Sequence, residues 1–263
     1  MLFAGALVLS SGNAAGGNCV INDSDGYSAS LGKPGDPVLS AYSGVSTYDA
    51  TSLEFNIIAQ VDGELTFSYI FGSEEYNEYV GSFNDVFGFF INGQNVAMIG
   101  NSAVTINNVN LNSNSNLFVN NDQSDFGSIT PHATQFDGFT KVLSTKPYQV
   151  ISGQTYHIKL AIADAADSVL DSIVFIKANS LAVCPAGLIN CNGNCVSCCP
   201  ASDFAQHVCL IDHNCCESDT GAHRQQPVQL QCSPVEVSQT SAVKPPAAEA
   251  ALLPKVASKG RAF

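Results

Sequence analysis

The sequence has few basic residues and no long apolar run. Residues 1–183 contain 5 Lys and Arg against 17 Asp and Glu, and the whole chain has a net charge of −13. An acidic surface repels phosphates and anionic headgroups, so nucleic acids are disfavoured as partners and cations are favoured. No apolar run reaches the roughly 18 residues that a transmembrane helix needs, so no membrane span is expected in this chain.

The usual catalytic fingerprints are also missing. The chain has no G-x-S-x-G, H-E-x-x-H, P-loop or dinucleotide-binding motif. His157 belongs to a predicted strand and lies on the face opposite the apolar side chains of that strand. No nucleophile with a plausible partner can be nominated for it to activate as a base. Two carboxylates suffice for glycoside hydrolysis, so Glu74 or Glu75 with Asp164 or Asp167 gives a weaker, enzymatic alternative. The sequence predicts a protein that is not an enzyme.

Cysteine is nearly absent from the first 183 residues, where Cys19 stands alone, and dense in the segment that follows. Such a cluster predicts a disulfide framework and an oxidising compartment, although the spacing gives neither the connectivity nor the partner of Cys19. The expected disulfide cysteines are Cys184, Cys191, Cys195, Cys198, Cys199, Cys209, Cys215, Cys216 and Cys232. A zinc site is the weaker alternative, and its ligands would come from Cys195, Cys198, Cys209, His207, His213 and His223.

Alternating apolar residues predict a series of short strands. Residues 53–61 and 65–71 each place every second apolar side chain on one face, and Asp62-Gly63 between them predicts a hairpin turn. Further strands are expected at 85–91, 95–99, 156–163 and 172–178. This pattern favours an all-β fold, an antiparallel, jelly-roll-like β-sandwich.

Two shifts in composition divide the chain. The sandwich is expected over residues 1–183, a small disulfide-rich module over 184–232, and a disordered Pro/Ala-rich tail over 233–263.

Carboxylates cluster in two segments between predicted strands. Calcium takes oxygen ligands from flexible loops, so these clusters predict a calcium site. Two interpretations remain open, since the same side chains also cap backbone N–H groups or close turns without an ion. Asp137 in FDGFT is interpreted as a turn residue. The candidate metal ligands are Glu74, Glu75, Glu78 and Asp85 in the first segment and Asp164, Asp167 and Asp171 in the second.

Long blocks between residues 45 and 180 resemble the choice-of-anchor L domain, a secreted or surface-displayed β-rich family found mostly in bacteria. They include FSYIFGSEEYNEYVGSFNDVFGFFINGQNVAMI, VTINNVN, FDGFT and GQTYHIKLAIADAADSVLDSIVFIKANS. CPAGLINCNGNCVSC, from Cys184 to Cys198, is similar to Cys-rich extracellular repeats and stands where this family usually carries an anchor. The resemblance implies an extracellular or cell-surface location.

The N-terminus has two interpretations. Its apolar run could be a signal peptide, although no Lys or Arg precedes it. ALVLSSGNAAGGN is, however, similar to an early strand of the same family, which implies that residues 1–18 are domain sequence and that the family domain extends upstream of Met1. Asn22-Asp23-Ser24 is a glycosylation sequon, which predicts Asn22 as an acceptor in a eukaryotic secretory pathway.

These observations predict a non-catalytic extracellular or cell-surface interaction module, with a role in adhesion and with calcium as its ligand. Its expected partner is an extracellular protein or a glycan. A carbohydrate-binding, lectin-like module is the main alternative.

Overall fold

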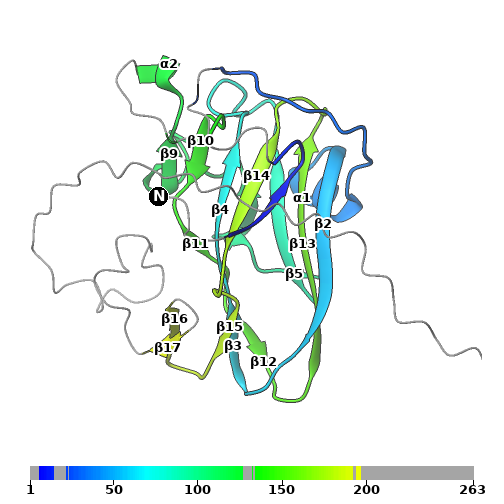
Figure 1. Cartoon of the computed structure of the whole chain (residues 1–263), viewed down its shortest axis with the longest axis vertical. Coiled ribbons are helices and arrows are strands. Elements are labelled where there is room, and N and C mark those ends of the chain that lie inside the picture. The colour runs from blue at the N-terminus through cyan, green and yellow to red at the C-terminus, as the bar shows by residue number, and fades with distance from the viewer. Residues whose placement is uncertain are drawn as a thin grey trace, which may run out of the picture. The chain divides into compact units, whose positions relative to one another are not determined.

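The computed structural model describes residues 6–14, 22, 24–126, 132, 134–191 and 194–196. Figure 1 shows a fold made almost wholly of strands, and all pairs of named strands are antiparallel. The predicted all-β class and the antiparallel β-sandwich are confirmed.

The elements have the following bounds. The strands are β1 (Ala6–Ser10), β2 (Thr47–Ile58), β3 (Gly63–Thr66), β4 (Ser68–Ser73), β5 (Val86–Ile91), β6 (Gln94–Asn95), β7 (Met98–Ile99), β8 (Ser102–Thr105), β9 (Phe118–Asn120), β10 (Gly138–Thr140), β11 (Leu143–Ser144), β12 (Tyr148–Val150), β13 (Thr155–Ala165), β14 (Ser172–Lys177), β15 (Ala182–Cys184), β16 (Ile189–Cys191) and β17 (Asn194–Val196). The helical segments are α1 (Pro37–Ser43), α2 (Gln123–Phe126) and a 3₁₀ turn, η1 (Ser115–Leu117).

Two sheets form the sandwich. The first has the order β1-β14-β4-β10-β9, with β11 also paired to β4. The second has the order β2-β13-β5-β8-β7, with β6 also paired to β5. Neighbours in each sheet come from distant parts of the chain, so the architecture depends on long-range pairing.

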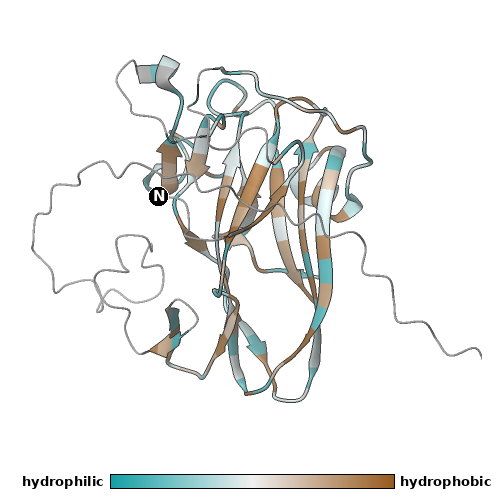
Figure 2. Ribbon diagram, viewed as in Figure 1, coloured by the Kyte–Doolittle hydropathy of each residue, from teal (hydrophilic) through white to brown (hydrophobic). Residues whose placement is uncertain are grey.

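The main core lies between the two sheets. Alternate residues of β4 and β14 face alternate residues of β5 and β13 across it, and the rings of Phe67 and Phe89 lie 4.3 Å apart. In Figure 2 the hydrophobic colour runs along these central strands. The aromatic and aliphatic side chains of the core include Phe67, Tyr69, Phe71, Phe87, Phe89, Ile91, Ile158, Leu160, Ile162, Val174 and Ile176.

Helix α1 covers part of the outer face of the second sheet. Leu39 is its buried residue, and it packs with Val86 and Phe90 of β5. The helix begins at an N-cap, Asp36, whose side chain accepts hydrogen bonds from the N–H groups of Val38 and Leu39.

The first sheet contains the apolar run at the N-terminus. Residues 6–10 form β1 and pair with β14, from Ala6 opposite Lys177 to Ser10 opposite Ile173. This segment is therefore part of the folded domain, as the family resemblance implied.

Two predicted strands are interrupted. The run 65–71 divides at Phe67 into β3 and β4, because the Phe67 N–H bonds to the Thr145 hydroxyl and the strands join different sheets. The run 95–99 divides into β6 and β7, because the Asn95 side chain accepts the N–H of Ala97. Local side-chain hydrogen bonds of this kind compete with the ladder.

The predicted hairpin at Asp62-Gly63 is wrong. β2 pairs with β13, whereas β3 lies between β12 and β15 in a separate three-stranded sheet. Glycine is needed at position 63 for another reason: a Cβ there would lie 2.3 Å from the carbonyl oxygen of Cys184 on β15. The glycine thus permits close approach of two strands rather than a turn.

The start of the Cys-rich segment continues this small sheet. Cys184 ends β15 and forms a disulfide with Cys195 in β17, with the two Cα atoms 5.3 Å apart. One disulfide of the expected framework is therefore present. Cys19, Cys198, Cys199, Cys209, Cys215, Cys216, Cys232, the histidines of the zinc alternative and the expected tail lie outside the described residues.

Candidate functional site

Carboxylates collect at one end of the sandwich, which we call the acidic end. It is the end at which β4, β9 and β13 finish and β5, β10 and β14 begin, at the top of Figure 1. Each of these strand ends is flanked by or contains an acidic residue, so the folding of the sheets brings them together. Eight of these side chains are at most 1% exposed: Asp49, Glu74, Glu75, Asp85, Asp122, Asp137, Asp164 and Asp171.

The two predicted acidic segments meet here. The backbone N–H of Glu74 donates to the carbonyl of Asp171, and the Asp85 carboxylate accepts from the N–H of Ala165 at 2.8 Å and from the hydroxyl of Ser172 at 2.6 Å. Residues that follow β4 and precede β5 therefore contact the end of β13, the start of β14 and Asp171 between them. Both acidic segments thus lie at the same end of the sandwich.

Glu75, Asp85 and Asp164 are three neighbouring acidic residues, and the side chains of all three are buried. Burial raises the pKa of Glu75 to about 9, and the charge of Asp85 adds to the rise. Burial also raises the pKa of Asp164, with the Asp85 charge as the next cause. Both oxygens of Asp164 are buried without a hydrogen-bond partner within the described residues, and the nearby Ser11 hydroxyl, which donates to the Ser172 carbonyl, acts against the rise of the Asp164 pKa. The raised pKa favours the protonated, neutral form of Asp164.

Glu74 and Asp171 cap backbone groups of an extended segment, residues 24–35, which we call the strap. The N–H of Tyr27 donates to Glu74 at 2.7 Å, and the N–H of Ala29 donates to Asp171 at 2.9 Å. Asp49 continues the series by accepting the N–H of Leu31 at 2.8 Å. Every second N–H of the strap thus points at a buried carboxylate, which is the structural interpretation that the sequence left open.

Glycine is required where the chain passes Asp171. A Cβ on Gly12 would lie 1.7 Å from the Asp171 carboxylate, so only a glycine fits. The SSGN segment after β1 therefore forms one wall of the acidic end.

The remaining predicted ligands lie nearer the surface. Asp167 is half-buried and accepts the N–H of Val169 at 3.1 Å, which is the turn-closing role considered for it. Glu78 is exposed, and its oxygen lies within 4.8 Å of oxygens of Asp122 and Asp125.

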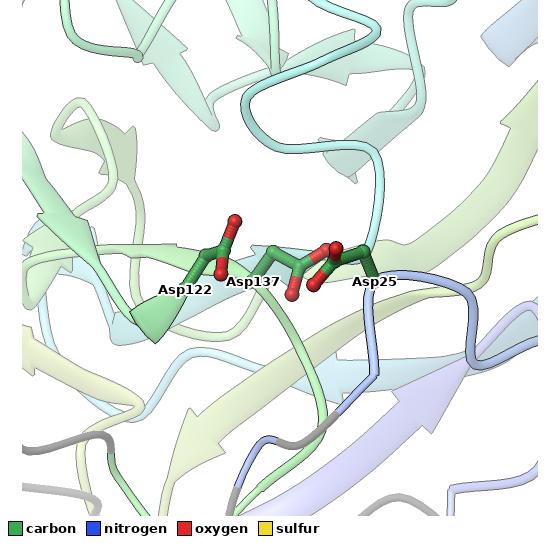
Figure 3. A group of neighbouring side chains, drawn as sticks. All are labelled: Asp25, Asp122 and Asp137. Carbon is green, nitrogen blue, oxygen red and sulfur yellow. The ribbon is translucent and has the colours of Figure 1, made fainter. Parts of the chain in front are cut away.

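Another carboxylate group was missed by sequence reasoning. Oxygens of Asp25, Asp122 and Asp137 all lie within 4.8 Å of one another. Figure 3 shows the three side chains together, with Asp137 between the other two. Asp25 belongs to the strap, Asp122 follows β9 and Asp137 precedes β10, so their sequence separation hides their proximity.

The chain bends at Asp137, but the interpretation of this residue as a simple turn residue is incomplete. Its side chain is fully buried, and Gly138 begins β10 instead of bending the chain. Burial raises the pKa of Asp137 to about 8, with the Asn22 hydrogen bond acting in the opposite direction and the Asp122 charge adding to the rise. Its position between two phenylalanines, Phe136 and Phe139, was the sequence signal that could have predicted a buried carboxylate here.

Asn22, the sequon residue, is 5% exposed. Its amide nitrogen donates to the Asp137 carboxylate at 2.7 Å and to the Asn121 carbonyl at 3.3 Å. This is the atom to which a glycan attaches, so glycosylation requires Asn22 to leave Asp137.

Charge at the acidic end is not balanced by basic side chains within the described residues. Among the described residues, ion pairs join Lys159 to Asp36 and Glu54, and His157 to Glu54, on the outer face of the second sheet. None of the eight buried carboxylates takes part. Neutral donors, protons or cations must therefore compensate for this charge.

The burial of Glu74, Glu75 and Asp164 argues against the glycosidase alternative. Glu74, Glu75 and Asp164 are closed off from solvent, whereas a hydrolase needs two carboxyl groups on either side of a bound sugar. Of the proposed pairs, only Asp167 reaches the surface.

The fold is a β-sandwich whose buried carboxylates lie at one end of its two sheets. A scan against protein-family models matches residues 1–182 to the Choice-of-anchor L domain, and the chain therefore belongs to that family. Searches of the curated proteins and of the solved structures give no significant match.

Membership of this family indicates a surface-associated, non-catalytic module at the cell surface or outside the cell. Among the described residues, no helix has the length and apolar character of a membrane span.

Proposed function

We propose that the domain is a non-catalytic interaction module of the cell surface or extracellular space that acts in adhesion and is stabilised by calcium at its acidic end. The observation that carries this proposal is the burial of eight carboxylates at one end with no basic partner in the described part of the chain. A divalent cation would neutralise neighbouring acids and fix the loops that carry them.

The loops of the acidic end also present apolar side chains to solvent. Leu31 of the strap, Tyr48 at the start of β2 and Val169 before β14 are 41%, 40% and 51% exposed. Exposed aromatic and aliphatic groups beside polar loops favour a protein partner at this end, because such side chains anchor interfaces. Calcium would hold these side chains in one arrangement and so reduce the cost of ordering them on binding.

We expect calcium to raise the thermal stability of the oxidised full-length chain. An ion that binds only the folded state at 10 mM, with a dissociation constant of about 0.1–1 mM, contributes about 1–3 kcal/mol. The unfolding midpoint in calcium should therefore exceed that in EDTA by several degrees. Sodium chloride at matched ionic strength is the control, and an equal midpoint in all three buffers would contradict the role of calcium.

A carbohydrate-binding module is the second candidate. Tyr79 is exposed in the loop after β4, and its ring packs edge-on against Phe83 at 5.6 Å, beside the acidic end. Such an aromatic ring with nearby polar groups suits a sugar face. Specific binding on a glycan array that is lost in Tyr79→Ala would favour this function. Hydrolysis of a chromogenic glycoside, lost in Glu75→Gln, would overturn the non-catalytic assignment.

A further inference from the structure

We propose that a calcium ion binds between Asp25, Asp122 and Asp137 and fastens the strap to the ends of β9 and β10. This inference rests on the proposed function, which assigns calcium to the acidic end but does not give its position. The proposed position differs from that predicted from the sequence, since none of its three ligands was among the candidates.

Geometry supports this position. The three carboxylate oxygens lie within 4.8 Å of one another, a spacing that allows one ion to contact all three. Glu75, Asp85 and Asp164 do not form such a group, although they are buried nearby. Asp137 and Asp122 are at most 1% exposed, while Asp25 is exposed and gives an ion access from solvent.

A buried oxygen without a partner points to a ligand. Asp137 uses Oδ1 to accept the amide of Asn22, but its Oδ2 is buried and has no hydrogen-bond partner within the described residues. Glu74, whose pKa is raised by burial and then by the Asp137 charge, also carries a buried Oε2 without a partner within the described residues. Buried polar atoms are normally satisfied, so an unpaired oxygen in a carboxylate group is where a cation is expected.

Hydrogen bonds within its own loop orient the Asp122 carboxylate as a calcium ligand. Its Oδ1 accepts the N–H of Ser124 at 2.7 Å, and its Oδ2 accepts the hydroxyl of the same residue at 3.0 Å. Each oxygen keeps a further lone pair. The carboxylate is therefore oriented before an ion arrives, as outer hydrogen bonds orient metal ligands in general.

The chemistry of the ligands selects the ion. All three are carboxylates, with no His or Cys in the group, which favours a hard cation over zinc or copper. The ligands come from three separate segments. Calcium tolerates variable geometry and takes further carbonyl and water oxygens, whereas magnesium needs a near-ideal octahedron. Calcium is thus the better match.

A neighbouring group is the competing position. Glu78, Asp122 and Asp125 also bring their oxygens within 4.8 Å of one another. However, the Asp125 Oδ2 atom already accepts the side-chain amides of Asn77 and Asn120, and both Glu78 and Asp125 are exposed. Within the described part of the chain, neither Glu78 nor Asp125 has a buried oxygen without a partner, whereas Asp137 has one, so this group has less need of an ion.

Equilibrium dialysis of the metal-free full-length chain against a calcium tracer tests the position. We expect saturable binding with a dissociation constant of about 0.1–1 mM, as in other extracellular modules. Asp25→Asn and Asp137→Asn should each weaken it at least tenfold. Glu78→Gln, Asp125→Asn and the distant, exposed Asp62→Asn should change it less than threefold. Asp25→Asn decides the matter alone if Asp137→Asn does not fold, because Asp25 is exposed.

The possible outcomes are distinct. Binding that survives Asp25→Asn but is lost in Glu78→Gln or Asp125→Asn overturns the position and leaves the proposed function intact. Binding that survives all these variants likewise places the ion elsewhere. No saturable binding by the unaltered chain overturns both the site and the calcium part of the proposed function.

Discussion

Replacing Asp164 by asparagine is expected to stabilise the domain at pH 8 by about 2 kcal/mol, because it removes an acid that folding forces to carry a proton. Asp164 is fully buried, and Asp85, Asp171 and Asp49 surround it with like charge. An asparagine amide has nearly the same shape as the protonated acid and can donate to the Asp85 carboxylate. The unfolding midpoint in EDTA should rise by about 4–8 °C.

The pH dependence follows from the direction of these shifts. Burial raises the folded-state pKa of Asp164, and that of Glu75 to about 9. Between the unfolded pKa values near 4 and these raised values, the folded state binds more protons than the unfolded state. The stability contribution is complete below pH 4 and is lost as the pH rises towards 9. In EDTA the unaltered domain should therefore lose stability between pH 5 and 9, and Asp164→Asn should lose less.

Asp62→Asn is the matched control, since Asp62 is exposed and lies far along the chain, beside the turn at Ser152. Its effect should stay within about 0.5 kcal/mol at either pH. A lower midpoint for Asp164→Asn in EDTA at pH 8 would show that the carboxylate is ionised and needed, contrary to the assignment of a proton to it.

Phe67→Ala should produce the largest loss of stability, about 3–5 kcal/mol. Phe67 is 1% exposed and lies where β3 passes into β4, and its ring packs on Phe89 of the opposite sheet and on Tyr69. Truncation leaves a cavity between the two sheets. Since domains are stable by only about 5–15 kcal/mol, the variant should lie close to unfolding.

Denaturant unfolding of the oxidised chain measures this effect. Ile58→Ala is the control, because Ile58 is 58% exposed on β2 and should change stability by less than about 0.5 kcal/mol. A loss below about 1 kcal/mol for Phe67→Ala would mean that the sheets do not pack through this residue.

Sequence reasoning recovered the features that depend on local alternation. Leu65, Phe67, Tyr69 and Phe71 share the core face as expected, because a strand places every second side chain on the same side. Local alternation does not show which strands pair with each other, so the strand order could not be predicted from it. A hairpin was predicted at Asp62-Gly63 because Asp-Gly is a hairpin turn signal, yet β2 pairs with β13 from the far part of the chain.

The candidate site shows the same division. Glu74, Glu75 and Asp85 were recognised because they cluster along the sequence, but their burial depends on the loops folding onto Asp164 and Asp171. Asp25, Asp122 and Asp137 are scattered along the chain and match no spacing motif. Only the topology, which brings the ends of β9 and β10 beside the strap, reveals them as a group.

The position of calcium tests the account most directly. Crystals of the oxidised chain grown in millimolar calcium, with data collected for anomalous scattering, would place any bound calcium without reference to stability. The account predicts a peak in the anomalous difference map between the carboxylates of Asp25, Asp122 and Asp137. A peak beside Glu75 and Asp85, or no peak at the acidic end, would contradict it.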